Sequence, residues 1–177
     1  MSVRQADAPQ TIQTARLMLR RFRPEDAADF HAILSDPEAM RYWSTPPHRK
    51  LAETVDWVGR TIAAVAAGEA DDFTALHEGR IVGKAGLWHG NELGMIFARQ
   101  CWGRGFASEA VRAVIGRAFG LGHASIKADV DPRNEKSRRI LAKLGFVETH
   151  RAERTLQVSE EWVDSIYLEL KAPVPSR

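Results

Sequence analysis

A glycine-containing loop in the middle of the chain has the residue types and spacing of an anion-binding site. It runs over residues 99–107, places Gly103 and Gly105 two positions apart, and leads directly into a predicted helix. Glycine lets a ligand approach the backbone closely, and the unpaired N–H groups at a helix N-terminus attract a phosphate or pyrophosphate. A tight turn that needs glycine only for its geometry explains the same residues, so the loop alone leaves both interpretations open.

Two common phosphate-binding patterns do not fit this loop. A nucleotide P-loop ends in Lys followed by Ser or Thr, whereas Phe106 and Ala107 occupy the corresponding positions here. A dinucleotide-binding fold places its glycine motif after the first strand, whereas several predicted strands precede this loop. The loop is therefore neither a nucleotide P-loop nor a dinucleotide-binding fingerprint.

The elements that position the loop follow from hydrophobic periodicity. Apolar residues recur at helical spacing in some segments and alternate or cluster as in strands elsewhere. The pattern predicts a helix opening at Pro24, helices over 51–67, 107–121 and 134–144, and strands over 16–20, 73–77, 81–88, 92–97, 125–130, from Phe146 and over 163–170. The sequence therefore predicts a mixed α/β (α+β) domain. The loop lies where a strand crosses to its helix, which is where open sheets bind ligands.

Length and composition limit the class of protein. The chain has 177 residues, 44% of them apolar and 27% charged, which predicts one globular domain over 14–171 with flexible ends at 1–13 and 172–177. No stretch is long and apolar enough to predict a membrane span, and the N-terminus has no signal-peptide pattern. The net charge of +2 gives no general reason to bind nucleic acid.

Cysteine and histidine usage point to a reducing compartment and to no metal. Cys101 is the single cysteine, which excludes an internal disulfide, and the six histidines have no ligand spacing. We expect a cytoplasmic protein without a metal site.

Four ordered motifs together resemble the GNAT N-acetyltransferase superfamily, and within it the RimJ/RimL-like branch. The resemblance covers about residues 14–170. The motifs are Glu92-Leu93-Gly94, the run from Trp102 to Ala110, the run from Asp131 to Ser137, and Leu144-Gly145-Phe146. The resemblance implies a central, mostly antiparallel mixed sheet of about seven strands, splayed between its fourth and fifth strands and flanked by about four helices. It also implies that acetyl-CoA binds as cosubstrate in the wedge.

The resemblance assigns the donor site residue by residue. The end of the fourth predicted strand would pair with the pantetheine, the loop amides would hold the pyrophosphate, and Asn134 would bind the pantetheine arm or order its loop. The residues implied are Met95, Ile96, Phe97, Trp102, Gly103, Arg104, Gly105, Phe106, Ala107, Asn134 and Ser137. Trp102 departs from the wider superfamily, which prefers Gln or Arg, and fits the Trp-Gly form of this branch. From these residues alone, without the other motifs, helix capping is the favoured explanation of Asn134 and Ser137. Arg133, Arg138 and Arg139 are candidates for the 3′-phosphate or a solvated face.

The transfer implied by the resemblance needs a neutral amine, a polarised thioester carbonyl and a proton for the sulfur. Glu92 is the candidate general base, acting through water, and Ser137 the candidate proton donor; a plain surface role for Glu92 stays open. Cys101 has no evident adjacent base, and the superfamily transfers the acetyl group directly, so we do not expect an acyl-enzyme.

The acceptor is the least determined part of the sequence. Tyr42, Trp43 and Trp162 are candidates for walls of its pocket, with core packing as the alternative. The branch implies a protein N-terminal α-amine, while an aminoglycoside or polyamine stays open within the class. A silent acyl-CoA-binding domain or a regulatory module are the rival functions. We expect no nucleic-acid or membrane partner, and a monomer or a homodimer.

Overall fold

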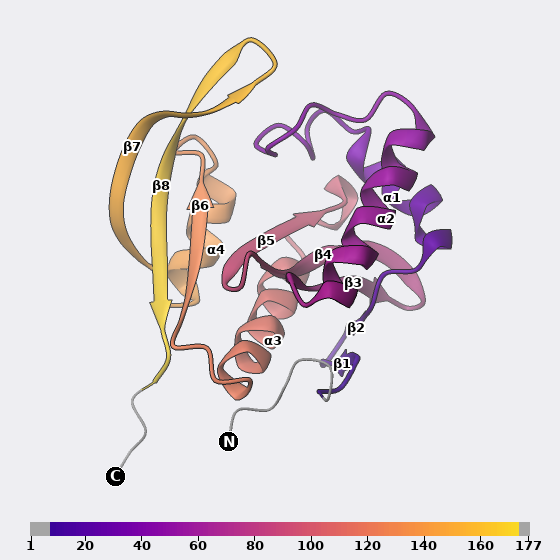
Figure 1. Ribbon diagram of the computed structural model, residues 1–177, viewed down its shortest axis with the longest axis horizontal. Helices are drawn as coiled ribbons and strands as arrows, with labels where there is room; N and C mark the ends of the chain where they lie inside the picture. Colours follow the sequence, from indigo (N-terminus) through magenta and orange to yellow (C-terminus); the bar gives the residue numbers. More distant parts are fainter. Residues whose placement is uncertain (1–7, 174–177) are drawn as a thin grey trace.

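The computed structural model describes residues 8–173, which form one eight-stranded sheet with helices on both faces (Figure 1). The strand order is β1-β2-β3-β4-β5-β6-β8-β7. The elements in chain order are β1 (Thr11–Gln13), β2 (Met18–Arg20), η2 (Pro24–Asp26), α1 (Ala27–Leu34), α2 (Leu51–Ala67), β3 (Ala70–His77), β4 (Arg80–Trp88), β5 (Glu92–Phe97), η3 (Arg99–Cys101), α3 (Phe106–Gly120), β6 (Ser125–Val130), α4 (Glu135–Lys143), β7 (Val147–Val158) and β8 (Glu161–Lys171).

The sheet opens between β5 and β6, as the resemblance implied for its fourth and fifth strands. All other neighbours pair antiparallel, whereas β5 and β6 run parallel and share one pair of residues, Glu92 with Lys127. Two further bonds fix this vertex, from the Lys127 N–H to the Asn91 carbonyl and from the Asn91 amide to the Ser125 carbonyl. Beyond it the two strands diverge (Figure 1), so the edge of β5 from Leu93 onward has no partner strand within residues 8–173.

The two faces of the sheet carry different chemistry. Arg117 of α3 bonds Asp71 and lies over the Phe73 ring, so α3 covers the face to which these residues of β3 belong. Thr74, on the opposite face, bonds Asp26 of η2. The register places on that second face, beside Thr74, several charged residues and glycines together with Trp88 and Ile96: Asp72, Lys84, Gly86, Gly94, Glu92, Lys127 and Asp129. The face under η2 and the α1–α2 loop is therefore the polar one.

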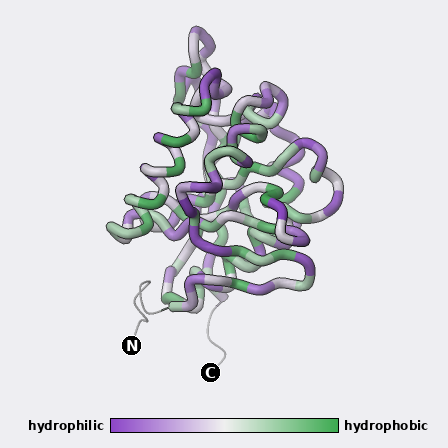
Figure 2. Tube along the Cα trace, turned by 90° about the vertical axis from the view of Figure 1, so that its right-hand side faces the viewer, coloured by the Kyte–Doolittle hydropathy of each residue, from purple (hydrophilic) through white to green (hydrophobic). Residues whose placement is uncertain are grey.

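The helices begin and end where their local sequences indicate. The α2 helix spans the predicted 51–67, and Gly68 ends it at a φ of 76°, a left-handed conformation that glycine adopts without strain. Asn134 caps α4 by accepting the Ser137 N–H at 3.1 Å. Hydrophilic and hydrophobic stretches alternate along the coils (Figure 2), as expected of helices with one buried side.

Three predictions differ from the structure. The sheet has eight strands rather than about seven, because Thr11–Gln13, assigned above to a flexible end, pairs with β2 as β1. Strand β3 begins at Ala70, before the predicted Phe73, because paired and buried acidic residues broke the hydrophobic pattern there. Ala172, the first residue of the predicted flexible C-terminal end, is held by a hydrogen bond from its N–H to the Ala124 carbonyl. The rest of the predicted flexible ends, 1–7 and 174–177, lie outside the described residues.

Candidate active site

One large cleft, of about 2210 Å³, occupies the opening between β5 and β6. Its walls come from the α1–α2 loop, β4, β5, the glycine loop, the starts of α3 and α4, β6 and the β7–β8 hairpin. Ligand pockets for single small molecules usually measure about 300–1,000 Å³, so this cleft has room for two reactants. Most predicted donor residues and the acceptor candidates Tyr42 and Trp43 border this common space, whereas Arg104, Phe106 and Trp162 do not line it.

The glycine loop has the backbone of an anion cradle. Gly103 and Gly105 have φ values of 74° and 81°, in the left-handed region, and the amides that follow open α3. Within residues 8–173 no side chain caps these amides, and a methyl group at Gly103 would meet no atom within 4 Å. The side chain of Phe106 points into the core instead. An anion fits here through the backbone and the helix dipole.

Arg16 supports this loop from behind. Its guanidinium donates to the Arg104 carbonyl at 2.9 Å and to Glu109 of α3 at 2.8 Å. Glu109 also accepts hydrogen bonds from the Arg16 N–H and from the Thr14 hydroxyl. Burial would raise the pKa of Glu109, but these hydrogen bonds and the arginine charge outweigh it and lower the pKa. The N-terminal segment thus fixes the cradle.

Trp102 connects the cradle to the open edge of β5 and to α4. Its indole N–H donates to the Phe97 carbonyl at 2.9 Å, and the Lys136 ammonium lies 3.9 Å from its ring centroid. Lys136 was not among the predicted site residues, and only its place one residue before Ser137 in the third motif could have indicated it. A cation over an indole face stabilises this arrangement.

The predicted pantetheine edge also borders the cleft. Met95, Ile96 and Phe97 line it, and beyond Glu92 this side of β5 has no partner strand among residues 8–173, although the Phe97 carbonyl accepts from Trp102. An extended amide-containing chain can pair with such an edge as an added strand does.

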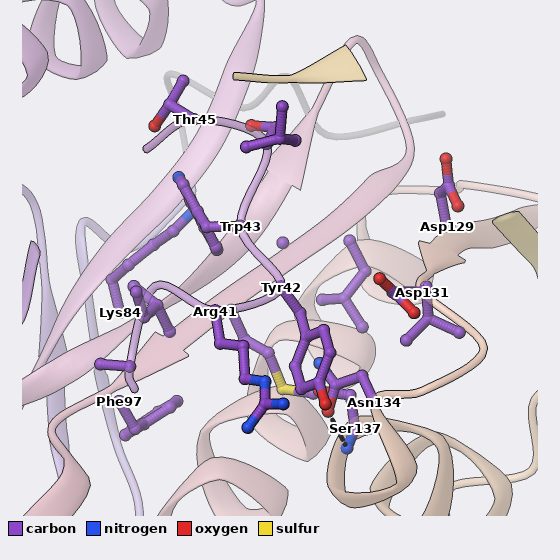
Figure 3. A pocket seen from close by; sticks show the side chains of 18 of the residues that line it. Arg41, Tyr42, Trp43, Thr45, Lys84, Phe97, Asp129, Asp131, Asn134 and Ser137 are labelled. Atoms are coloured by element: carbon purple, nitrogen blue, oxygen red, sulfur yellow. Dashed lines mark hydrogen bonds between the residues drawn. The ribbon is translucent and has the colours of Figure 1, made fainter. Parts of the chain in front are cut away.

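Asn134 and Ser137 lie together at the start of α4 (Figure 3), and both line the cleft. The Oδ1 atom of Asn134 caps the helix, so the capping interpretation of these residues is correct for that atom. Its amide NH₂ has no partner among residues 8–173. Arg133, a candidate for the 3′-phosphate, instead bonds Asp131 at 2.7 Å and Glu161 of the hairpin at 2.6 Å. It ties the hairpin to the α4 end of the cleft.

Only two of the three predicted acceptor residues line the cleft. Tyr42 and Trp43 line the cleft from the α1–α2 loop (Figure 3), whereas Trp162 is not part of its wall. Trp162 is 46% exposed on the hairpin, where the Arg154 guanidinium lies 5.1 Å from its ring centroid. The hairpin contributes Leu156 and Val163 to the cleft instead.

Two carboxylates stand at the opening of the sheet. Glu92, the predicted base, is exposed at the vertex and lines the cleft. Asp129, which the sequence did not indicate, lies on the same face from β6. Desolvation by the walls of the cleft raises the pKa of Asp129, because it disfavours the charged carboxylate. A hydrogen bond from Ser165 lowers this pKa, and the nearby charge of Asp131 raises it.

A buried lysine forms part of the cleft wall. Lys84 of β4 pairs with Asp72 of β3 at 2.8 Å, and its ammonium lies near the rings of Trp43 and Trp88. A lysine inside a hydrophobic strand gives no sequence signal of its partner, so sequence reasoning missed it.

Cys101 is buried, and burial raises the pKa of its thiol while the Arg104 charge only partly offsets it. A protonated thiol is a poor nucleophile.

The sequence and the structure both match known acetyltransferases. The family described as "Acetyltransferase (GNAT) domain" matches residues 16–147. The chain belongs to the GNAT acetyltransferase family. A relative, the uncharacterized N-acetyltransferase p20 of Bacillus licheniformis, is 32% identical over 146 residues, covering 77% of this chain and 82% of p20. The chain is thus an acetyltransferase with acetyl-CoA as donor, and the predicted fold is confirmed.

Solved structures similar in fold act on different amines. A spermidine N-acetyltransferase from Vibrio cholerae, in complex with CoA and spermine, superposes with a TM-score of 0.78 at 19% identity, over 89% of this chain and 96% of that one. A ribosomal-protein-S5-alanine acetyltransferase from Vibrio fischeri gives 0.78 at 21% identity, over 91% and 96%. At these identities the likeness extends to the fold. Within residues 8–173 no helix is long and apolar enough to cross a membrane, and no three metal-ligating side chains converge.

Proposed function

We propose that this protein transfers the acetyl group of acetyl-CoA to a primary amine, favouring the α-amine of a protein N-terminus, by direct attack on the thioester. The observation that supports this most is the single cleft at the opening of the sheet. It joins the backbone cradle of Gly103 and Gly105, the unpaired edge of β5 and the carboxylates Glu92 and Asp129. A donor on one side and an amine on the other can therefore meet.

The donor side binds through backbone and a few fixed side chains. The amides from Gly103 to Ala107 would hold the pyrophosphate, the edge at Met95–Phe97 the pantetheine, and the free amide NH₂ of Asn134 the same arm. When bound, acetyl-CoA supplies an activated acyl carbon and a thiolate leaving group. Trp102 and Lys136 keep the cradle aligned with β5, which fixes the thioester relative to the amine.

Glu92 or Asp129 removes the proton from the attacking amine, directly or through water, and Ser137 donates a proton to the departing sulfur. A lysine amine, with a reference pKa of about 10.4, is almost fully protonated at pH 7, whereas an α-amine near 7.7–8.0 is partly neutral. A carboxylate with a raised pKa, as in Asp129, is the stronger proton acceptor. Both carboxylates lie on the polar face, beside the cleft, where the amine must enter.

The acceptor preference rests on an α-amine needing less deprotonation and on a fold shared with ribosomal-protein N-acetyltransferases. The spermidine enzyme of the same fold supports the second candidate, a polyamine. We also propose that the protein works in the cytoplasm, as a monomer or a homodimer, and that Tyr42 and Trp43 contact the acceptor.

A free-thiol release assay with acetyl-CoA tests the proposal. The acceptor panel contains peptides with free N-termini, lysine peptides, polyamines and aminoglycosides, and calorimetry with CoA runs beside it. Faster thiol release with N-terminal peptides than with the other amines is the expected result. CoA binding without turnover on any acceptor would indicate a silent acyl-CoA-binding domain, and absence of CoA binding would contradict the donor site.

A further inference from the structure

The buried Lys84 is not explained by packing. Its side chain is 2% exposed and that of Asp72 is fully buried. A buried ion pair stabilises a fold no better than apolar side chains of similar volume do, because desolvation offsets the attraction. The charge also lies in the wall of the cleft rather than in the apolar core under α3. Its position therefore suggests a role toward what the cleft holds.

Two glycines leave the space in which this pair lies. The register aligns Asp72 with Gly86 and Gly86 with Gly94, across β3, β4 and β5. A Cβ at Gly86 would collide with Asp72, and a Cβ at Gly94 would lie 3.3 Å from the Lys84 Nζ atom. The ammonium therefore lies over Gly86 of β4, between Asp72 of β3 and the Gly94 position of β5.

Hydrogen bonds at Asp72 and aromatic rings near Lys84 fix the orientation of the ion pair. The Asp72 carboxylate accepts hydrogen bonds from Lys84 and the Trp88 indole, both at 2.8 Å, and from the Phe73 N–H at 3.0 Å. The ammonium is held at the cleft end, with the ring centroids of Trp43 and Trp88 at 5.4 and 5.8 Å from Nζ. Figure 3 shows the Lys84 side chain running toward the Trp43 ring. Asp72 is thus the inner end of the pair and Lys84 the outer end.

We propose that Lys84 is an acceptor-specificity residue that favours amines with a carbonyl or carboxylate oxygen beside the reacting nitrogen and disfavours polyamines. In the wall of the cleft, the Lys84–Asp72 pair presents its ammonium end, and Glu92 and Asp129 present carboxylates; Lys127, which pairs with Glu92 on the same face, does not line the cleft. An α-amino acyl group matches this pattern, because its nitrogen can lie at the carboxylates and its oxygen toward the ammonium. A second cationic nitrogen in place of that oxygen meets repulsion at short range in a water-poor wall. The inference rests on the proposed function and adds a cause for its acceptor preference.

The test compares two acceptors with the same carbon skeleton, alaninamide and 1,2-diaminopropane. We measure kcat/KM for each by thiol release with the wild-type protein and with the charge-neutral variant Asp72→Asn/Lys84→Met. The different basicities of the two amines cancel when the ratio of their kcat/KM values is compared between proteins. We expect the ratio of alaninamide to diamine to fall about tenfold in the double variant. Lys143→Met, on the exposed side of α4, is the matched control and should leave the ratio unchanged.

A second variant guards against misfolding. Asp72→Asn/Lys84→Gln replaces the ion pair with two neutral polar side chains, leaves no unpaired buried charge, and should lower the ratio in the same direction. Thermal unfolding and CoA titration show which variants are folded. A ratio within twofold of wild type in a folded variant would overturn the role of Lys84, since a merely structural lysine would lower both activities together. If the wild-type protein acetylates neither these acceptors nor any amine of the wider panel, the proposed function itself fails.

Discussion

The donor and acceptor halves of the cleft are built in different ways. The proposed donor half comes from one short stretch, residues 95–107, plus the start of α4, and it would bind mainly through backbone groups. The acceptor half draws single side chains from separate elements: Trp43 from the α1–α2 loop, Lys84 from β4, Asp129 from β6 and Leu156 from the hairpin. A backbone cradle depends on local conformation, whereas the acceptor half depends on how distant elements are placed.

The difference has a consequence for substitution. Because most of the proposed donor contacts are main-chain groups, side-chain changes should affect them only through φ angles or through anchors such as Trp102. In the acceptor half each side chain carries its own charge or surface to the ligand. Donor affinity and acceptor turnover should therefore respond separately to mutation.

The largest effect is expected in the acceptor half, from Asp129→Asn. If Asp129 is the base, kcat should fall about 100-fold while CoA affinity stays unchanged. The carboxylate must be ionised to accept a proton, so wild-type activity should fall as the pH drops through its pKa, which lies above the ordinary value of an aspartate. A thiol-release pH–rate profile measures both.

Glu92→Gln is the competing variant. The two carboxylates lie near the same vertex. Only substitution of the carboxylate that acts as the base should abolish the fall in activity at low pH. Loss of this fall in Glu92→Gln, with Asp129→Asn retaining it, would assign the role to Glu92.

The donor half should respond to Gly105→Ala. Alanine is strained at a φ of 81°, and its Cβ would lie 3.2 Å from the Arg16 guanidinium. We expect CoA to bind about 20-fold more weakly by calorimetry, because the amides at the start of α3 shift. Gly68→Ala has a similar φ of 76° at the end of α2 and is the matched control. Equal CoA affinity in both variants would count against the cradle.

Trp102→Phe should have a smaller effect on the donor half. It keeps an aromatic face for Lys136 but removes the hydrogen bond to the Phe97 carbonyl. We expect KM for acetyl-CoA to rise about fivefold, the equivalent of one neutral hydrogen bond, with little change in acceptor preference. A change confined to the acceptor KM would contradict the separation of the two halves.

The smallest effect on activity is expected from Glu109→Gln, which weakens the support behind the cradle. The lowered pKa of Glu109 means that its stabilising contribution is present above the ordinary glutamate pKa of 4.5 and is lost as the pH falls through the folded-state value. The variant should be about 1–2 kcal/mol less stable at pH 7 and should lose less stability between pH 7 and pH 3. Urea unfolding at several pH values measures this.

Local sequence determined much of the fold and most of the donor half. Helix α2, strands β5 and β6 and the cap at Asn134 lie where periodicity and turn residues predict them, because these signals act within a few residues. The glycine loop before α3 is similarly local, so its turn into the helix could be predicted from the sequence, and its role as an anion cradle stays a prediction.

Only the tertiary structure decided the acceptor half. Lys84 and Asp72 are twelve residues apart and meet because β3 and β4 pair in one register, with Gly86 leaving room. Asp129 reaches the cleft because β6 pairs with β5 only at the vertex. Trp162 lies outside the cleft because the β7–β8 hairpin places Leu156 and Val163 in the wall instead. Strand register and strand divergence depend on the whole sheet, and a one-residue shift would move each of these side chains to the other face.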